Sequence, residues 1–218
     1  KLIEKAKETA AEMLESAVSD IEFDNGDFKI VGTDRVVTFR SVAEKAAGEN
    51  SVAFDEKETF APEEATYPNG THVCELEIDM ATGEIELVDY TVVDDFGRVI
   101  NPLLLEGQVH GGIAQGLGQA ILESCQYESG SGQLLSASFM DYTMPRADDF
   151  PAIRFKRNEV PCETNPLGIK GAGEAGAIGA PPAIVNAIVN ALSDHGIRHV
   201  DMPVSPNKVW DILQNVSA

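Results

Sequence analysis

The sequence has few basic residues, few cysteines and no long apolar run, and each shortage excludes a class of protein. Sixteen basic residues stand against thirty-six acidic ones, which gives a formal net charge of −20. A surface this negative repels phosphate backbones, so we expect no nucleic-acid partner. No uninterrupted apolar stretch approaches the length of about 18 residues that a bilayer requires, so we also expect no membrane span.

The cysteines and histidines are too few and too scattered to form a framework. Cys74, Cys125 and Cys162 are far apart, odd in number and without a C-x-x-C pair. This usage disfavours disulfides and fits a reducing, cytoplasmic location, with the cysteines acting as small core side chains. Among the four histidines only His195 and His199 are spaced for one helical face, and no third ligand is nearby. We therefore expect no metal held by protein side chains.

Hydrophobic periodicity predicts an α+β fold, in which antiparallel or mixed sheets are each covered by helices on one face. The second hairpin is the clearest element, because inward and outward positions alternate in its first strand and return in its second after a one-residue slip at Val88. Helices are expected over 2–18, 39–46, 102–123, 181–192 and 206–213, and strands over 21–23, 28–32, 72–80, 85–95 and 152–160.

Five glycines interrupt the helix expected from Pro102: Gly107, Gly111, Gly112, Gly116 and Gly118. Each glycine in a helix interior costs about 0.8–1 kcal/mol relative to alanine, so helix propensity does not account for them. Either another element packs closely against this helix or a ligand approaches its backbone. Gln108 and Gln115 share one face, and an amide both donates and accepts, as the edge of a heterocycle requires. Solvent-exposed glutamines give the same pattern.

A second glycine cluster contains Gly171, Gly173 and Gly176, which spell G-x-G-x-x-G. A dinucleotide fingerprint requires a strand directly before the motif and a helix that begins within it. Pro166 and Gly168 break the preceding segment, and Pro181 is the expected helix start. The context therefore disfavours a nicotinamide-binding site.

Glu174 stands at the centre of this second cluster, between Gly173 and Ala175. A carboxylate on a loop with so little side-chain bulk has open space in front of it. If the loop is buried, the carboxylate suits a general base. The alternative is a solvated loop glutamate, which the spacing of the residues alone slightly favours.

Three segments, in this order and spacing, resemble the C-terminal part of the large subunit of the xanthine dehydrogenase/aldehyde oxidase family of molybdenum hydroxylases. They are "VDDFGRVINPLLLEGQVHGGIAQGLGQAILE", "SFMDYTMPRADDFP" and "TNPLGIKGAGEAGAIGAPPAIVNAIVNAL". The resemblance is strongest to the branch that includes carbon monoxide dehydrogenase large chains. It implies that residues 1–218 are the C-terminal portion of a molybdenum-cofactor-binding domain, and that a longer large subunit contains them.

The resemblance also implies a cofactor and roles for particular residues. The cofactor would be molybdopterin, usually as the cytosine dinucleotide, with molybdenum ligated by no protein side chain. The family's catalytic glutamate falls in the GxGE motif at Glu174, where it takes the proton from the metal-bound hydroxyl. Gln108 matches a position that hydrogen-bonds the pterin. The residues expected against the cofactor are Gln108, Gly107, Gly111, Gly171, Ala172 and Gly173.

The chain departs from the family in length, because the earlier segments that complete the active site and cradle the dinucleotide are not present. We therefore expect the isolated chain to be inactive. The expected partners are the remainder of the large subunit, an iron–sulfur subunit, an FAD subunit and a small-molecule substrate. That substrate would be an aldehyde, an N-heterocycle or carbon monoxide, the last with copper beside molybdenum. The alternative is a non-catalytic interaction module of the same ancestry.

Overall fold

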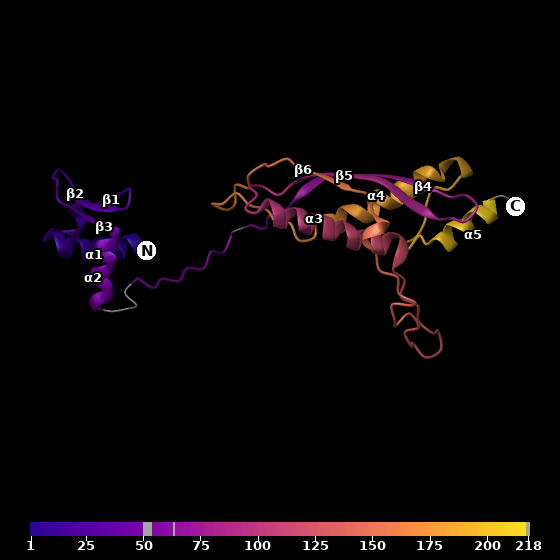
Figure 1. The fold of residues 1–218 in the computed structure, drawn as a ribbon, viewed down its shortest axis with the longest axis horizontal. Helices are drawn as coiled ribbons and strands as arrows, with labels where there is room; N and C mark the ends of the chain where they lie inside the picture. Colours follow the sequence, from indigo (N-terminus) through magenta and orange to yellow (C-terminus); the bar gives the residue numbers. More distant parts are fainter. Residues whose placement is uncertain (50–53, 63, 217–218) are drawn as a thin grey trace. The chain divides into compact units, whose positions relative to one another are not determined.

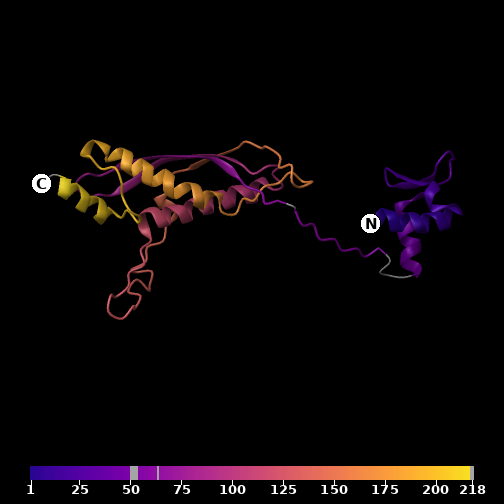
Figure 2. The same ribbon diagram turned by 180° about the vertical axis from the view of Figure 1, so that it is seen from behind.

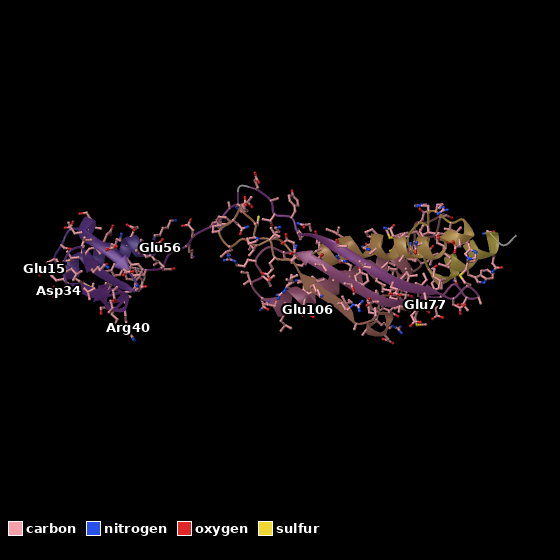
Figure 3. The ribbon with its side chains drawn as sticks, turned by 90° about the horizontal axis from the view of Figure 1, so that it is seen from above. Glu15, Asp34, Arg40, Glu56, Glu77 and Glu106 are labelled. Atoms are coloured by element: carbon pink, nitrogen blue, oxygen red, sulfur yellow. The ribbon has the colours of Figure 1, made fainter. Side chains whose placement is uncertain are left out.

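The computed structural model describes residues 1–49, 54–62 and 64–216. The chain divides into two compact units, residues 1–61 and residues 62–218. Acidic side chains such as Glu15 in the first unit and Glu77 in the second extend from the surface of each (Figure 3), as the charge of −20 requires. No helix in the described ranges combines the length and apolar character of a bilayer crossing.

The first unit packs two helices on a small antiparallel sheet. Its elements in chain order are α1 (Leu2–Leu14), β1 (Ile21–Asp24), β2 (Asp27–Ile30), β3 (Val36–Thr38) and α2 (Phe39–Glu49). The expected hairpin turn is confirmed, since Asn25 and Gly26 both adopt the positive φ of a tight turn. Thr38 caps α2 by accepting a hydrogen bond from the Ser41 backbone N–H. Ala6, Ala10 and Phe28 lie at the centre of this unit's core.

The second unit carries the larger core and contains every residue of the predicted site. Its elements are β4 (Asn69–Ile78), β5 (Ile85–Asp95), α3 (Pro102–Leu117), β6 (Ile153–Arg157), α4 (Ala175–Ala191) and α5 (Pro206–Val216). The sheet order is β4-β5-β6, with β4 and β5 antiparallel and β5 and β6 parallel. Helices α3 and α4 run along one face of this sheet (Figures 1 and 2). One antiparallel and one mixed sheet, each with helices, confirm the predicted fold class.

The long hairpin of the second unit follows its sequence pattern closely. Glu75 pairs with Asp89 and Leu76 with Leu87, so Val88 is the extra residue of a bulge, as predicted. Tyr90 is fully buried after the bulge, while the inward side chains of β4 are only partly covered. The strand expected over 72–80 ends earlier, at Ile78, and the alternation does not extend to Met80, which lies in the turn and is exposed.

Helix α4 begins earlier than the sequence predicted. It starts at Ala175, so Pro181 and Pro182 lie inside the helix. Proline lacks the N–H that an interior helical position donates, which is why the sequence predicts a helix start at Pro181. Here the first two turns are held by close packing of Gly176 and Ala180 on α3, and Pro181 itself is buried in that contact. Tertiary packing therefore outweighs the local preference of proline.

The cysteine prediction holds for Cys74, which packs partly against the hydrophobic core, whereas the described core residues do not include Cys162. Cys74 and Cys162 are half-buried, but Cys125 is exposed. Cys125 follows the five-residue π-helix Gly118–Leu122, where the chain leaves the core. Its reading as a core side chain is therefore wrong.

Candidate functional site

Glu174 occupies the N-cap position of α4, at the point where the glycine-rich loop becomes helical. Its backbone oxygen accepts the hydrogen bond of the Ile178 N–H at 2.9 Å, so the main chain of Glu174 is fixed by the first helical turn. Its side chain makes no cap hydrogen bond and is exposed. A carboxylate at this end of a helix is favoured by the partial positive charge of the free N–H groups.

The loop before Glu174 offers bare backbone. A Cβ atom added at Gly171 or Gly173 would meet no atom within 4 Å, so no described residue explains the absence of a side chain at either position. Ala172, between them, packs partly against the hydrophobic core. Gly171 donates its backbone N–H to the Thr66 hydroxyl at 3.3 Å. The loop is therefore attached at Ala172 and open at the two glycines.

The glycines of α3 divide into two groups with different causes. A Cβ at Gly112 would lie 2.9 Å from the backbone nitrogen of Ala177, and one at Gly116 would lie 2.7 Å from the Cβ of Ala180. These two glycines are explained by the contact with α4. A Cβ at Gly107 or Gly111 would meet nothing within 4 Å. The sequence left two explanations for these glycines, and each applies to part of the helix. Close helix packing accounts for Gly112 and Gly116, and an open face remains at Gly107 and Gly111.

The α3–α4 contact brings the predicted site residues together where α4 begins. Gly112 lies against Gly176, and Gly116 lies against Ala180, so the two helices advance in the same direction in four-residue steps. Gln108 is one turn before Gly112 on α3, and Glu174 is two residues before Gly176 on α4. Gln108 and Glu174, both exposed, therefore lie on neighbouring helices at the start of α4, beside the middle of α3.

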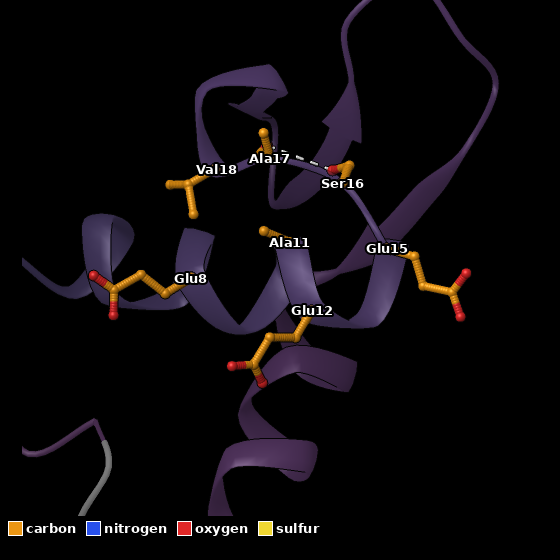
Figure 4. Close-up of a pocket in the computed structure, with 7 residues that line it drawn as sticks. All are labelled: Glu8, Ala11, Glu12, Glu15, Ser16, Ala17 and Val18. Atoms are coloured by element: carbon orange, nitrogen blue, oxygen red, sulfur yellow. Dashed lines mark hydrogen bonds between the residues drawn. The ribbon is translucent and has the colours of Figure 1, made fainter.

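The depressions characterised among the described residues do not include Glu174 in their lining. A cavity of about 130 Å³ at the start of α4 is lined by Ala175, Ile178 and residues of the sheet, but not by Glu174. A second, open depression surrounds the last turns of α1 (Figure 4), where Glu8, Glu12 and Glu15 lie, and it contains no predicted site residue. The Glu174 side chain is exposed in this chain, so the chain alone does not provide the burial that would suit this carboxylate to act as a general base.

The small cavity contains a polar cluster that sequence reasoning missed. His72 Nδ1 lies 2.8 Å from the Tyr90 hydroxyl, and His72 Nε2 lies 3.6 Å from Asp94 Oδ1. The second Asp94 oxygen is buried without a partner among the described residues. A signal for this cluster exists in the sequence, because His72 shares the inward phase of Cys74, and Asp94 shares that of Tyr90. Burial raises the pKa of Tyr90 well above its usual value.

The glycine motif is not a dinucleotide fingerprint, although part of the sequence argument was wrong. Helix α4 does begin within the motif, between Gly173 and Gly176. However, Ile169 before the motif forms only an isolated antiparallel bridge to Gly97. No strand follows α4 within the described ranges, so the parallel βαβ unit that such a site needs is not formed around the motif.

Residues 1–151 match the family model of the molybdopterin cofactor-binding domain, which is more than half of the chain. The chain belongs to this family. The model match ends before Glu174, but individual relatives align with nearly the whole chain.

A dehydrogenase subunit is among the relatives of this molybdopterin cofactor-binding domain. The gamma subunit of the 6-hydroxypseudooxynicotine dehydrogenase complex of Paenarthrobacter nicotinovorans is 34% identical over 99% of the chain. A crystal structure of Cu,Mo-CO dehydrogenase is similar with a TM-score of 0.82 and 29% identity over 99% of the chain. Quinoline 2-oxidoreductase from Pseudomonas putida 86 gives a TM-score of 0.79 and 34% identity over 98% of the chain.

The chain is much shorter than these relatives. It spans 28% of the 6-hydroxypseudooxynicotine dehydrogenase subunit and 28% of each of the two solved chains. The similarity therefore establishes the family and the fold of this part.

Proposed function

We propose that the chain is the C-terminal portion of the molybdenum-cofactor-binding domain of a molybdenum hydroxylase large subunit, in which Glu174 is the catalytic base. The observation that carries the proposal is the meeting, at the start of α4 beside the middle of α3, of an exposed carboxylate and bare backbone. Glu174 follows open Gly171 and Gly173, and α3 presents Gln108 between open Gly107 and Gly111.

The residues fit a molybdopterin. Four glycines surrounded by open space allow a flat ring system to approach the backbone, which side chains would prevent. At an exposed helical position each such glycine lowers stability by about 0.8–1 kcal/mol relative to alanine, and no packing within the described residues compensates at Gly107 or Gly111. Gln108 would hydrogen-bond the pterin edge, and Gly171, Ala172 and Gly173 would lie along it. The pyranopterin form we expect is the cytosine dinucleotide.

The chemistry divides between cofactor and chain. When bound, the cofactor would supply a molybdenum centre that accepts two electrons from the substrate. An iron–sulfur subunit and then an FAD subunit would carry these electrons away. The Glu174 carboxylate would accept the proton of the water-derived oxygen nucleophile at one of its Oε atoms. A base needs a defined position and restricted water, so the remainder of the large subunit must cover the exposed side of Glu174.

The substrate class we propose is an aldehyde, an N-heterocycle or carbon monoxide. Relatives named for a hydroxylated pyridine alkaloid, for quinoline and for carbon monoxide resemble this chain to similar extents. The residues of this chain therefore do not distinguish these substrates. A cytoplasmic location fits the unpaired thiols of Cys74, Cys125 and Cys162. We expect the isolated chain to purify without stoichiometric molybdenum and without activity.

The test is Glu174→Gln in the complete enzyme with its partner subunits. The amide keeps the size of the side chain and removes the proton acceptor, so kcat should fall by about 10²-fold or more, with molybdenum content unchanged. Glu163→Gln is the matched control, because Glu163 is exposed in the same segment and should leave kcat unaltered. Full activity of the Glu174 variant would instead favour a non-catalytic interaction module of the same ancestry.

A further inference from the structure

The loop that carries Glu174 is attached to the sheet by one buried ion pair. Lys170 Nζ donates a hydrogen bond to Asp95 Oδ2 at 2.6 Å, and only 12% of the Lys170 side chain and 6% of the Asp95 side chain are exposed. Asp95 is the last residue of β5, and Lys170 is four residues before Glu174. The ion pair therefore connects a rigid strand end to the beginning of the GxGE motif.

The Asp95 carboxylate is fully engaged. Its other oxygen accepts the backbone N–H of Gly97 at 2.8 Å and that of Val160 at 3.1 Å. Burial raises the pKa of Asp95, but the Lys170 ammonium and the two backbone N–H groups outweigh burial and hold it below its usual value. Asp95 is thus charged at neutral pH and holds two distant segments, at Val160 and Lys170, against the turn that follows β5.

Backbone hydrogen bonds extend the attachment on either side of Lys170. The Lys170 N–H donates to the Phe96 carbonyl at 2.9 Å, and the Arg98 N–H donates to the Gly168 carbonyl at 2.8 Å. Between them Gly97 forms an antiparallel bridge with Ile169. Residues up to Lys170 are therefore held against the end of β5 through both main chain and side chain.

Beyond Lys170 two contacts hold the loop before the helix begins: the Gly171 N–H donates to the Thr66 hydroxyl at 3.3 Å, and Ala172 packs partly against the core. Gly171 and Gly173 have no side chains, and glycine has the widest choice of backbone conformations. The next strong attachment is Gly176, whose Cα lies in close contact with α3. Glu174 therefore lies where two held segments meet: the segment fixed on the sheet at Lys170, and the first turn of α4, to which its own main chain belongs and which packs on α3 at Gly176.

We propose that Lys170 and Asp95 are positioning residues for Glu174. The proposal rests on the proposed function, because it states that the ion pair fixes the position of the Glu174 carboxylate relative to the proton that this base accepts. Stability is a poor reason for such a pair, because a buried ion pair is often no better than apolar side chains of similar volume. A displacement of about 1 Å at a reacting group, in contrast, costs roughly 10²-fold in rate.

The experiment uses Lys170→Met, Lys170→Arg and Asp95→Asn in the complete enzyme, with rates expressed per bound molybdenum. For Lys170→Met we expect kcat to fall about tenfold or more while KM changes less than about twofold, because binding is retained and the base is misplaced. Lys170→Arg keeps a cation and should restore most of kcat. Asp95→Asn keeps the acceptor for the Gly97 N–H and should resemble Lys170→Met.

A second readout does not depend on turnover. Amide hydrogen exchange of peptides covering residues 168–178 should accelerate in Lys170→Met and return toward the parent rate in Lys170→Arg. Arg154→Met is the matched control, since Arg154 pairs with Asp89 on the same strand β5 but is 66% exposed. That variant should change neither kcat nor exchange in the loop.

Unchanged kcat and unchanged exchange in Lys170→Met would overturn the proposal. So would a loss of activity fully explained by lower molybdenum content, or one that arginine does not restore, because either indicates folding alone. Glu174→Gln, measured in parallel, separates the two ideas. An active Glu174 variant refutes the proposed function, whereas an inactive Glu174 variant with a fully active Lys170→Met refutes only the positioning role.

Discussion

Alanine substitutions at two helical glycines should have opposite effects on the stability of this chain. At Gly176 a Cβ would lie 2.5 Å from the Val109 carbonyl oxygen and 2.7 Å from the Ile113 nitrogen, both of them backbone atoms that no rotamer change removes. Overpacking costs about 1–3 kcal/mol, and contact with backbone places it at the upper end. Alanine recovers about 1 kcal/mol of helix propensity, so Gly176→Ala should destabilise by about 2 kcal/mol.

At Gly107 no atom lies within 4 Å of the added Cβ. Only the propensity gain remains, so Gly107→Ala should stabilise the chain by about 0.8–1 kcal/mol. Urea unfolding followed by circular dichroism measures both variants against the parent chain. A loss of stability in Gly107→Ala, or none in Gly176→Ala, would contradict the division of the α3 glycines into packed and open groups.

The same substitution at Gly107 tests the cofactor face in the complete enzyme. Gly107→Ala should lower the molybdenum content of the purified enzyme, because the added methyl group occupies the space into which the pterin would fit. Gly48→Ala in α2 is the matched control, since Gly48 is also a helical glycine with nothing within 4 Å of its added Cβ. Full molybdenum content in both variants would refute the assignment of Gly107 to the cofactor.

Two further predictions concern titration. Burial, with Asp89 nearby, raises the pKa of Cys74 to about 11, whereas a hydrogen bond with Thr164 lowers the pKa of Cys162. Only about one in 10³ Cys74 side chains is then a thiolate at pH 8, so iodoacetamide should modify Cys162 before Cys74. Peptide mass spectrometry measures the two rates, and equal rates would contradict the burial of Cys74. The lowered pKa of Asp95 stabilises the fold above the unfolded value of about 4, and this contribution is lost as the pH falls through the folded value. The stability difference between parent and Asp95→Asn, measured from urea midpoints, should therefore shrink below pH 4, and a constant difference would show that the Asp95 charge is not involved.

The sequence by itself determined the elements whose pattern is local. The bulge at Val88 followed from the change of phase between Leu87 and Tyr90, and the turn at Asn25 and Gly26 followed from residues that tolerate positive φ. Segment order and spacing also identified the family, which the match to residues 1–151 confirmed. These features depend on neighbours within a few residues or on long stretches of sequence, and both are visible without a structure.

Only the tertiary structure decided features in which distant segments meet. The start of α4 at Ala175 depends on the fit of Gly176 against α3, which outweighs the preference of Pro181 for a first turn. The ion pair between Asp95 and Lys170 joins residues 75 positions apart, and the local sequence around either residue does not predict it. The structure also decided which α3 glycines pack against α4 and which face open space. The sequence shows only that a side chain is missing, and it does not show what lies opposite that position.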